Sequence, residues 1–107
     1  MSKYHNTKTT VFGHTFDSRH EAERYIVLRS MEKSGLISNL RLQVPYELVQ
    51  GRKIKGKTIR PSYYIADFVY TCGGEEVVED AKGVKTAVYQ LKKKLMADRY
   101  GILIQEA

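Results

Sequence analysis

The sequence predicts an α/β (α+β) domain in which a mixed sheet of about four strands is flanked by two helices. Two segments with helix-capping signals, one near each end of the chain, enclose three segments with the pattern of strands. A short apolar run follows the second helix. The order helix, three strands, helix, strand is typical of layered folds with one core. A length of 107 residues, 42% of them hydrophobic, is enough for one such core.

The first part of the chain predicts a loose start and then a helix. Residues 1–10 are polar and are expected to form a flexible N-terminal segment, which leaves residues 11–107 as a single domain. Residues 11–16 predict a short extended piece. Asp17-Ser18 can cap a first helix that ends at about Ser34, because Gly35 follows.

Three strands are predicted next. Residues 40–48 alternate apolar and polar side chains, the pattern of a strand with one buried face, and Pro45 indicates an edge position. A basic, glycine-punctuated loop or hairpin covers residues 51–60. The second strand spans residues 62–70, and a glycine turn leads to the third at residues 76–82.

The last part predicts a helix and a final strand. Thr86 can cap a helix from about Ala87 to Arg99, and Gly101 is its expected stop. Val88, Leu91 and Leu95 share one side of this helix. Ile102-Leu103-Ile104 predicts the final strand.

The composition favours a polyanionic partner. The chain has 18 Lys+Arg against 12 Asp+Glu, which gives a formal charge of +6 and a pI near 9.5. Nucleic acid is the leading candidate. An anionic membrane is the competing one, but no apolar run is long enough to span a bilayer and no signal peptide is present, so we expect a soluble, cytoplasmic protein. A lone Cys72 and three scattered His exclude a disulfide framework and give no zinc-ligand spacing.

Two acids and a lysine occur within the second and third strands. An ionised Asp67 in the middle of an apolar strand needs a reason, since burying an unpaired charge is costly. Side chains alternate along a strand, so Asp80 and Lys82 project together, and antiparallel pairing through the glycine turn brings Asp67 close to Asp80. Such carboxylates suit Mg²⁺ or Mn²⁺. A lysine beside them can orient a water and stabilise charge on a phosphate. The alternative is an Asp80–Lys82 ion pair on a solvated face.

A third acid comes from the first helix. Glu21 lies on the helical stripe of Tyr25 and Leu28 and faces the interior, which makes it a candidate ligand. Ser18 and Glu21 also form a capping-box pattern, in which the glutamate bonds back to the helix start. The two interpretations carry about equal weight.

The basic residues form two groups that are natural contacts for phosphates. They are Arg52, Lys53, Lys55, Lys57 and Arg60 in the central loop, and Lys85, Lys92 and Lys93 at the second helix. A solvated face is the alternative for both groups. Tyr63 and Tyr64 can stack on bases, or at least one of them belongs to the core.

The chain resembles the PD-(D/E)xK nuclease superfamily, and within it a family of small phage and prophage proteins related to Holliday-junction-resolvase-like endonucleases. The likeness covers most of residues 11–106. It rests on Phe16-Asp17-Ser18, Glu21-Ala22, Tyr25, Tyr64-Ile65-Ala66-Asp67-Phe68 and Glu79-Asp80-Ala81-Lys82-Gly83. The superfamily's restriction-endonuclease-like αβββαβ core agrees with the predicted element order. Ala66 stands where the superfamily has proline, and Asp80 where glutamate is commoner.

The resemblance implies catalytic roles for Glu21, Asp67, Asp80 and Lys82. The three acids and the carbonyl of Ala81 would hold the metal, and Lys82 would position water. The implied function is a divalent-metal-dependent endodeoxyribonuclease of phage recombination or replication that acts on branched or double-stranded DNA as a homodimer. Its products would carry a 5′-phosphate and a 3′-hydroxyl. One alternative is a non-catalytic DNA-binding accessory protein on the same scaffold, and another is a protein-interaction module.

Overall fold

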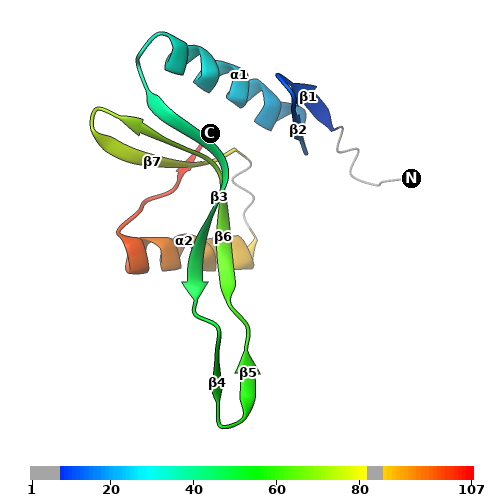
Figure 1. Cartoon of the computed structure of the whole chain (residues 1–107), viewed down its shortest axis with the longest axis vertical. Coiled ribbons are helices and arrows are strands. Elements are labelled where there is room, and N and C mark those ends of the chain that lie inside the picture. Colours follow the sequence, from blue (N-terminus) through cyan, green and yellow to red (C-terminus); the bar gives the residue numbers. More distant parts are fainter. Residues whose placement is uncertain (1–7, 82–85) are drawn as a thin grey trace.

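The computed structural model describes residues 8–81 and 86–107, and this part of the chain forms two helices and eight strands (Figure 1). Their bounds in chain order are β1 Thr9–Val11, β2 His14–Phe16, α1 Arg19–Lys33, β3 Ser38–Val49, β4 Arg52–Ile54, β5 Lys57–Ile59, β6 Ser62–Cys72, β7 Glu75–Asp80, α2 Ala87–Tyr100 and β8 Gln105–Glu106. The predicted α+β class is confirmed.

The central sheet has the strand order β3-β6-β7-β8. The first three strands pair antiparallel, and β8 pairs parallel with β7, so the sheet is mixed, as predicted. β3 lies at the edge, which is where Pro45, having no N–H to donate, is tolerated.

The two helices pack against different parts of the sheet. One core cluster joins α1 to Phe68 and Tyr70 of β6, and the other joins α2 to Tyr64 and Ala66 of the same strand. The alternating apolar residues of β3 divide in the same way. Leu40 and Leu42 contact the α1 cluster, whereas Val44, Tyr46 and Leu48 belong to the α2 cluster.

The change between the two clusters occurs at Gln43. This residue has φ +52°, a left-handed conformation that is rare inside a strand and interrupts the regular pleat. The predicted alternation is present, and its two halves pack against two different cores.

The ends of both helices are as predicted. The side chain of Ser18 caps α1 by accepting the Glu21 N–H, and the side chain of Thr86 caps α2 by accepting the Tyr89 N–H. Gly101 ends α2 with φ +67°, a conformation that glycine adopts without strain.

Two predicted element bounds are wrong, and of the apolar side of α2 noted in the sequence only Leu95 packs against the core. Residues 9 and 10, assigned to the flexible segment, belong to β1, which forms a hairpin with β2. The final strand is Gln105–Glu106 instead of residues 102–104, because only these residues pair with β7. On α2, Val88 and Leu91 are exposed, while Tyr89 and Met96 are buried against the sheet.

The basic segment after β3 forms the β4–β5 hairpin. Figure 1 shows this hairpin extending from the ends of β3 and β6, away from both helices. Neither of the helices in the described part of the chain combines the length and apolar character that crossing a membrane requires.

Candidate functional site

Glu21 lies in the first turn of α1 and faces the sheet. Glu21 is 3% exposed, and its carboxylate is one of the few charged groups that are buried among the described residues. Half of the predicted capping box is present, because the Ser18 hydroxyl accepts the Glu21 N–H at 3.1 Å. The carboxylate reaches β3, where its Oε2 accepts a hydrogen bond from Gln43 Nε2 at 3.1 Å.

Gln43 also bonds Asp67, and so joins two acids. The register pairs Leu42 with Phe68 and Val44 with Ala66, which places Gln43 directly opposite Asp67. Its Nε2 donates to Asp67 Oδ1 at 3.3 Å. Carboxylate oxygens of Glu21 and Asp67 therefore lie around a single amide nitrogen, although the two residues come from a helix and a central strand.

Asp80 lies across from Asp67 on the neighbouring strand. Phe68 pairs with Glu79, so the next pair in the antiparallel register is Asp67 with Asp80, as predicted from the glycine turn. Asp67 Oδ2 accepts the Ala81 N–H at 2.8 Å, which fixes the end of β7 against β6.

The Asp80 carboxylate has a different partner. Its Oδ2 accepts a hydrogen bond from the Tyr64 hydroxyl at 3.0 Å. Tyr64 is buried, and burial together with the charge of Asp80 raises the pKa of the Tyr64 hydroxyl, which keeps it protonated as a donor. Asp80 is thus held by the α2 core cluster, whereas Glu21 belongs to the α1 side.

The donor set fits a hard divalent cation in its chemistry. Glu21, Asp67, Asp80 and the carbonyl of Ala81 offer only oxygen, the ligand type that Mg²⁺ and Mn²⁺ prefer. In residues 8–81 and 86–107, however, no three His, Cys, Asp or Glu side chains are gathered closely enough to hold a metal ion. The structure brings Glu21 and Asp67 together through Gln43 and places Asp80 opposite Asp67 with its carboxylate bonded to Tyr64.

Two predicted site residues, Lys82 and Lys85, lie outside the described residues. The chain is described up to Ala81, which is 1% exposed and packs in the α1 cluster.

Glu79 occupies the other face of β7 from Asp80, as the strand pattern predicts. The Arg24 guanidinium donates to both of its carboxylate oxygens, at 2.8 and 2.7 Å, and the Tyr70 hydroxyl donates to Oε2. The hydrogen bond to Glu79 raises the pKa of Arg24, and burial raises the pKa of Tyr70 to about 12. This buried group ties α1 to β7 and so fixes Glu21 relative to Asp80.

The basic residues of the β4–β5 hairpin are all exposed, as a phosphate-binding role requires: Arg52, Lys53, Lys55, Lys57 and Arg60. On α2, Lys93 pairs with Glu106 of β8 at 3.4 Å and so has a structural partner. Lys92 lines a hollow with Tyr63 and Tyr64. Tyr63 is 43% exposed and Tyr64 is 3% exposed, so one of the two tyrosines belongs to the core and the other can reach a ligand.

Sequence reasoning missed Gln43 and Arg24. Gln43 stands at a polar position of an alternating strand, where a glutamine is ordinary, and its left-handed backbone has no local sequence signal. Arg24 is one of several cations on α1, and only the packing of α1 against β7 identifies Glu79 as its partner.

Comparisons with known proteins place the chain in one family. No curated protein and no solved structure matches it. A protein family matches residues 1–105, which is nearly the whole chain. The chain therefore belongs to the family described as "Protein of unknown function (DUF1064)".

Proposed function

We propose that this protein is a divalent-metal-dependent endodeoxyribonuclease of the PD-(D/E)xK type that hydrolyses phosphodiester bonds in branched or otherwise structured DNA. The observation that carries the proposal is the meeting of Glu21 and Asp67 at the Gln43 amide, with Asp80 opposite Asp67 on the next strand. The three acids come from three separate elements, α1, β6 and β7.

Electrostatics supports a cation at this place. Two carboxylates near one another repel, and the repulsion grows as the surroundings exclude water. Glu21 is almost fully buried, and Asp67 is partly buried. A divalent ion held by Glu21, Asp67, Asp80 and the Ala81 carbonyl would relieve this repulsion. When bound, such an ion would polarise the phosphate and lower the pKa of a water molecule.

The other residues of the proposed site position the reactants. Lys82, two positions after Asp80, is proposed to orient the attacking water and to stabilise negative charge on the phosphate. The water loses a proton to solvent as its oxygen attacks phosphorus and the new oxygen–phosphorus bond forms. The bond to the 3′-oxygen breaks, and this oxygen takes up a proton from solvent to give the 3′-hydroxyl. The Ala81 N–H and the Tyr64 hydroxyl hold Asp67 and Asp80 in place for this chemistry.

The projecting hairpin supports DNA as the substrate. Four cations stand on the exposed β4–β5 hairpin and Arg60 follows it directly, so all five can contact phosphates without any cost of burial. The proposed protein is a homodimer, because a two-fold pair of sites can make paired nicks in a branched substrate.

Cleavage and binding assays on one panel of substrates test this function. Labelled duplex, flap, fork and four-way junction DNA are incubated with Mg²⁺, and binding to the same DNA is measured in EDTA. Asp67→Asn and Lys82→Ala are expected to reduce cleavage about 100-fold or more while leaving binding intact. Asp98→Asn, at an exposed position on α2, is the matched control and should cleave normally. Full activity of Asp67→Asn contradicts the proposed metal site.

A non-catalytic DNA-binding protein is the second candidate. Two observations favour it: the described residues contain no group of three acids close enough to hold a metal ion, and the Asp80 carboxylate bonds Tyr64. Strong, salt-dependent binding together with no nicking of any substrate in Mg²⁺ or Mn²⁺ would establish this alternative.

A further inference from the structure

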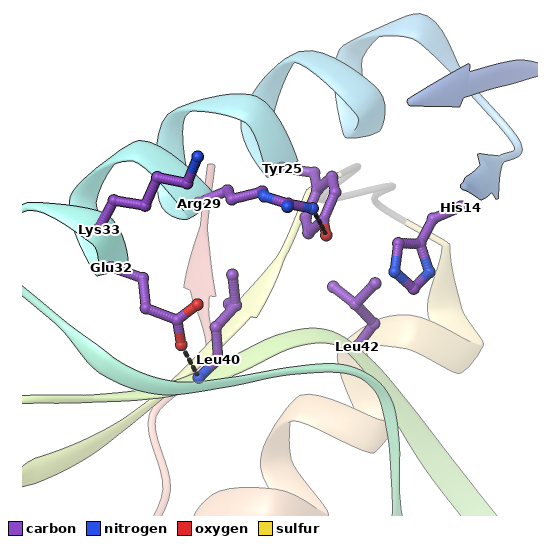
Figure 2. Close-up of a pocket in the computed structure, with 7 residues that line it drawn as sticks. All are labelled: His14, Tyr25, Arg29, Glu32, Lys33, Leu40 and Leu42. Carbon is purple, nitrogen blue, oxygen red and sulfur yellow. Dashed lines mark hydrogen bonds between the residues drawn. The ribbon is translucent and has the colours of Figure 1, made fainter. Parts of the chain in front are cut away.

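A groove of about 480 Å³ lies between α1 and β3, and it is separate from the basic hairpin. Figure 2 shows Arg29, Glu32 and Lys33 on the helix side, Leu40 and Leu42 on the strand side, and His14 of β2 beside Leu42. The groove is open to solvent. Its walls combine apolar side chains with several charged ones.

This groove adjoins the proposed active site. A smaller hollow of about 170 Å³ is lined by Glu21 and Gln43, the helix acid and the amide that bonds it. His14 and Leu42 line both spaces, so they lie at the boundary between them. A chain-like ligand that lies in the groove would therefore lead to the acids.

The two α1 cations of the groove differ from the other arginines of this helix in having no acidic partner among the described residues. In the described part of the chain, Arg19 pairs with Glu23 and Arg24 pairs with Glu79, whereas Arg29 and Lys33 have no acidic partner. They are four residues apart, so they lie on one face of the helix. An unpaired arginine and lysine beside a hollow attract an anion.

Local contacts hold the Arg29 guanidinium in place. Its Cζ lies 4.1 Å from the centroid of the Phe12 ring, and its Nη1 donates to the Tyr25 hydroxyl at 3.3 Å (Figure 2). The remaining N–H groups of the planar fork keep a fixed direction, which lowers the entropic cost of binding a phosphate. Glu32, the acid of this groove, accepts the Leu40 N–H at 2.9 Å and so supports the β3 wall.

We propose that this groove binds a backbone phosphate of the nucleic acid, next to the phosphate that is cleaved, through Arg29, Lys33 and His14. The proposal rests on the proposed function, since it takes a polynucleotide as the ligand. The groove would be a second DNA contact, formed by α1 and β2, in addition to the β4–β5 hairpin. The DNA would then be held on both sides of Glu21, Asp67 and Asp80. Arg29 is the specific contact, because its fork matches two phosphate oxygens, and Lys33 adds charge.

The test compares DNA binding of Arg29→Gln and Lys33→Gln with that of Arg41→Gln, all measured in EDTA across a range of salt concentrations. Arg41 lies on β3 and pairs with Glu76 at 3.1 Å, so its variant removes the same charge from a cation that is already neutralised. Each groove variant is expected to weaken binding about 10-fold and to reduce the slope of log Kd against log salt by about 0.9, the value for one lost phosphate contact. Arg41→Gln should change both the affinity and the salt slope by less than the groove variants do. Arg29→Lys keeps the charge and should recover part of the affinity.

A direct readout accompanies the variants. The side-chain Nε–Hε signal of Arg29 is followed by ¹⁵N NMR while a short oligonucleotide or inorganic phosphate is added to the wild-type protein. A shift with both ligands, saturating at lower concentration with the oligonucleotide, supports a site for a polynucleotide phosphate. A shift with inorganic phosphate alone overturns the proposal that the groove binds a polynucleotide, and it indicates a site for a free anion.

The outcomes separate this proposal from the function on which it rests. If wild-type protein binds and cleaves DNA but the groove variants match Arg41→Gln, the groove is not a contact and the nuclease stands. If the groove variants weaken binding but no protein cleaves any DNA, the groove stands and the catalytic proposal fails. If the wild-type protein binds no DNA, both fail.

Discussion

The hydroxyl of Tyr64 donates a hydrogen bond to Asp80 Oδ2 at 3.0 Å, and this bond joins a core tyrosine of β6 to an acid at the end of β7. Tyr64 is 3% exposed and cannot move without disturbing the α2 cluster. The position of the Asp80 carboxylate is therefore set by the core. An acid held by such a partner is pre-organised as a ligand, because the hydrogen bond fixes the orientation of the whole carboxylate.

Tyr64→Phe should weaken metal binding while keeping the fold. The ring still fills the core, but Asp80 loses the donor that orients it, and we expect Mn²⁺ affinity to fall about 10-fold. Titration calorimetry with Mn²⁺ measures this. Tyr46→Phe is the matched control, since the Tyr46 hydroxyl donates to Glu76, away from the acids. An unchanged affinity in Tyr64→Phe would remove this bond from the site.

Gln43→Glu should make the stability of the protein depend on divalent cations. A third carboxylate would replace the amide that Glu21 and Asp67 share, so we expect unfolding to become easier by about 2 kcal/mol without metal. Mg²⁺ should restore most of the loss, since it neutralises the cluster. Thermal melts with and without Mg²⁺ measure both effects.

Gln43→Met is the control for Gln43→Glu. It removes the amide without adding charge, so its lost stability should not return with Mg²⁺. Equal responses of the two variants to Mg²⁺ would show that the added carboxylate does not meet the other acids.

The Arg24–Glu79 pair should contribute more to stability than the exposed Arg41–Glu76 pair, whose glutamate also lies on β7. Glu79 is 1% exposed and bonds both Arg24 and Tyr70, so Glu79→Gln leaves a half-buried guanidinium without its anion. We expect a loss of about 3 kcal/mol in the free energy of unfolding. Glu76→Gln, which breaks the exposed pair with Arg41, should cost less than about 1 kcal/mol. Urea unfolding of both variants measures the difference, and similar losses would contradict the structural role of Glu79.

Alkaline pH should destabilise the protein through its tyrosines. Burial raises the pKa of Tyr46 and of Tyr70 to about 12, from an ordinary value of 10.0. The folded protein holds these protons more tightly than the unfolded chain, so their contribution is complete below pH 10 and is lost as the pH rises toward 12.

Ultraviolet titration of tyrosinate measures this effect without interference, because the chain has 8 Tyr and no Trp. Part of the tyrosinate signal should appear only near pH 12 or at unfolding, and Tyr70→Phe should reduce that part. A single transition near pH 10 for all tyrosines would contradict the burial of these hydroxyls.

The elements set by local chemistry were predictable from the sequence. Ser18, Thr86 and Gly101 act within one turn of the helices that they begin or end, so their residue types carry the signal. The pairing of β6 with β7 also follows from the glycine turn between them, and it places Asp67 opposite Asp80.

Features that depend on long-range packing were not predictable. Val88 and Leu91 have the same helical spacing as a core stripe, and only the position of the sheet shows that Tyr89 and Met96 are buried in their place. The apolar residues of β3 divide between two cores on either side of the left-handed Gln43, and no alternating pattern distinguishes this from a regular strand. The link from Gln43 to Glu21 then depends on the packing of α1 over β3.

Replacing Lys53, Lys55 and Lys57 with alanine should weaken DNA binding for all sequences alike. These side chains stand on the projecting β4–β5 hairpin and are exposed, so they can act as phosphate contacts that read no bases. The slope of log Kd against log salt should fall by about 0.9 for each lysine that contacts duplex DNA. Thr58→Ala on the same hairpin removes no charge and should leave the slope unchanged. Mn²⁺ binding should be retained in the lysine variant, because the hairpin extends away from both helices (Figure 1) and none of the three lysines belongs to the proposed metal site. An unchanged slope would assign the hairpin to solvent and leave the groove beside α1 as the principal DNA contact.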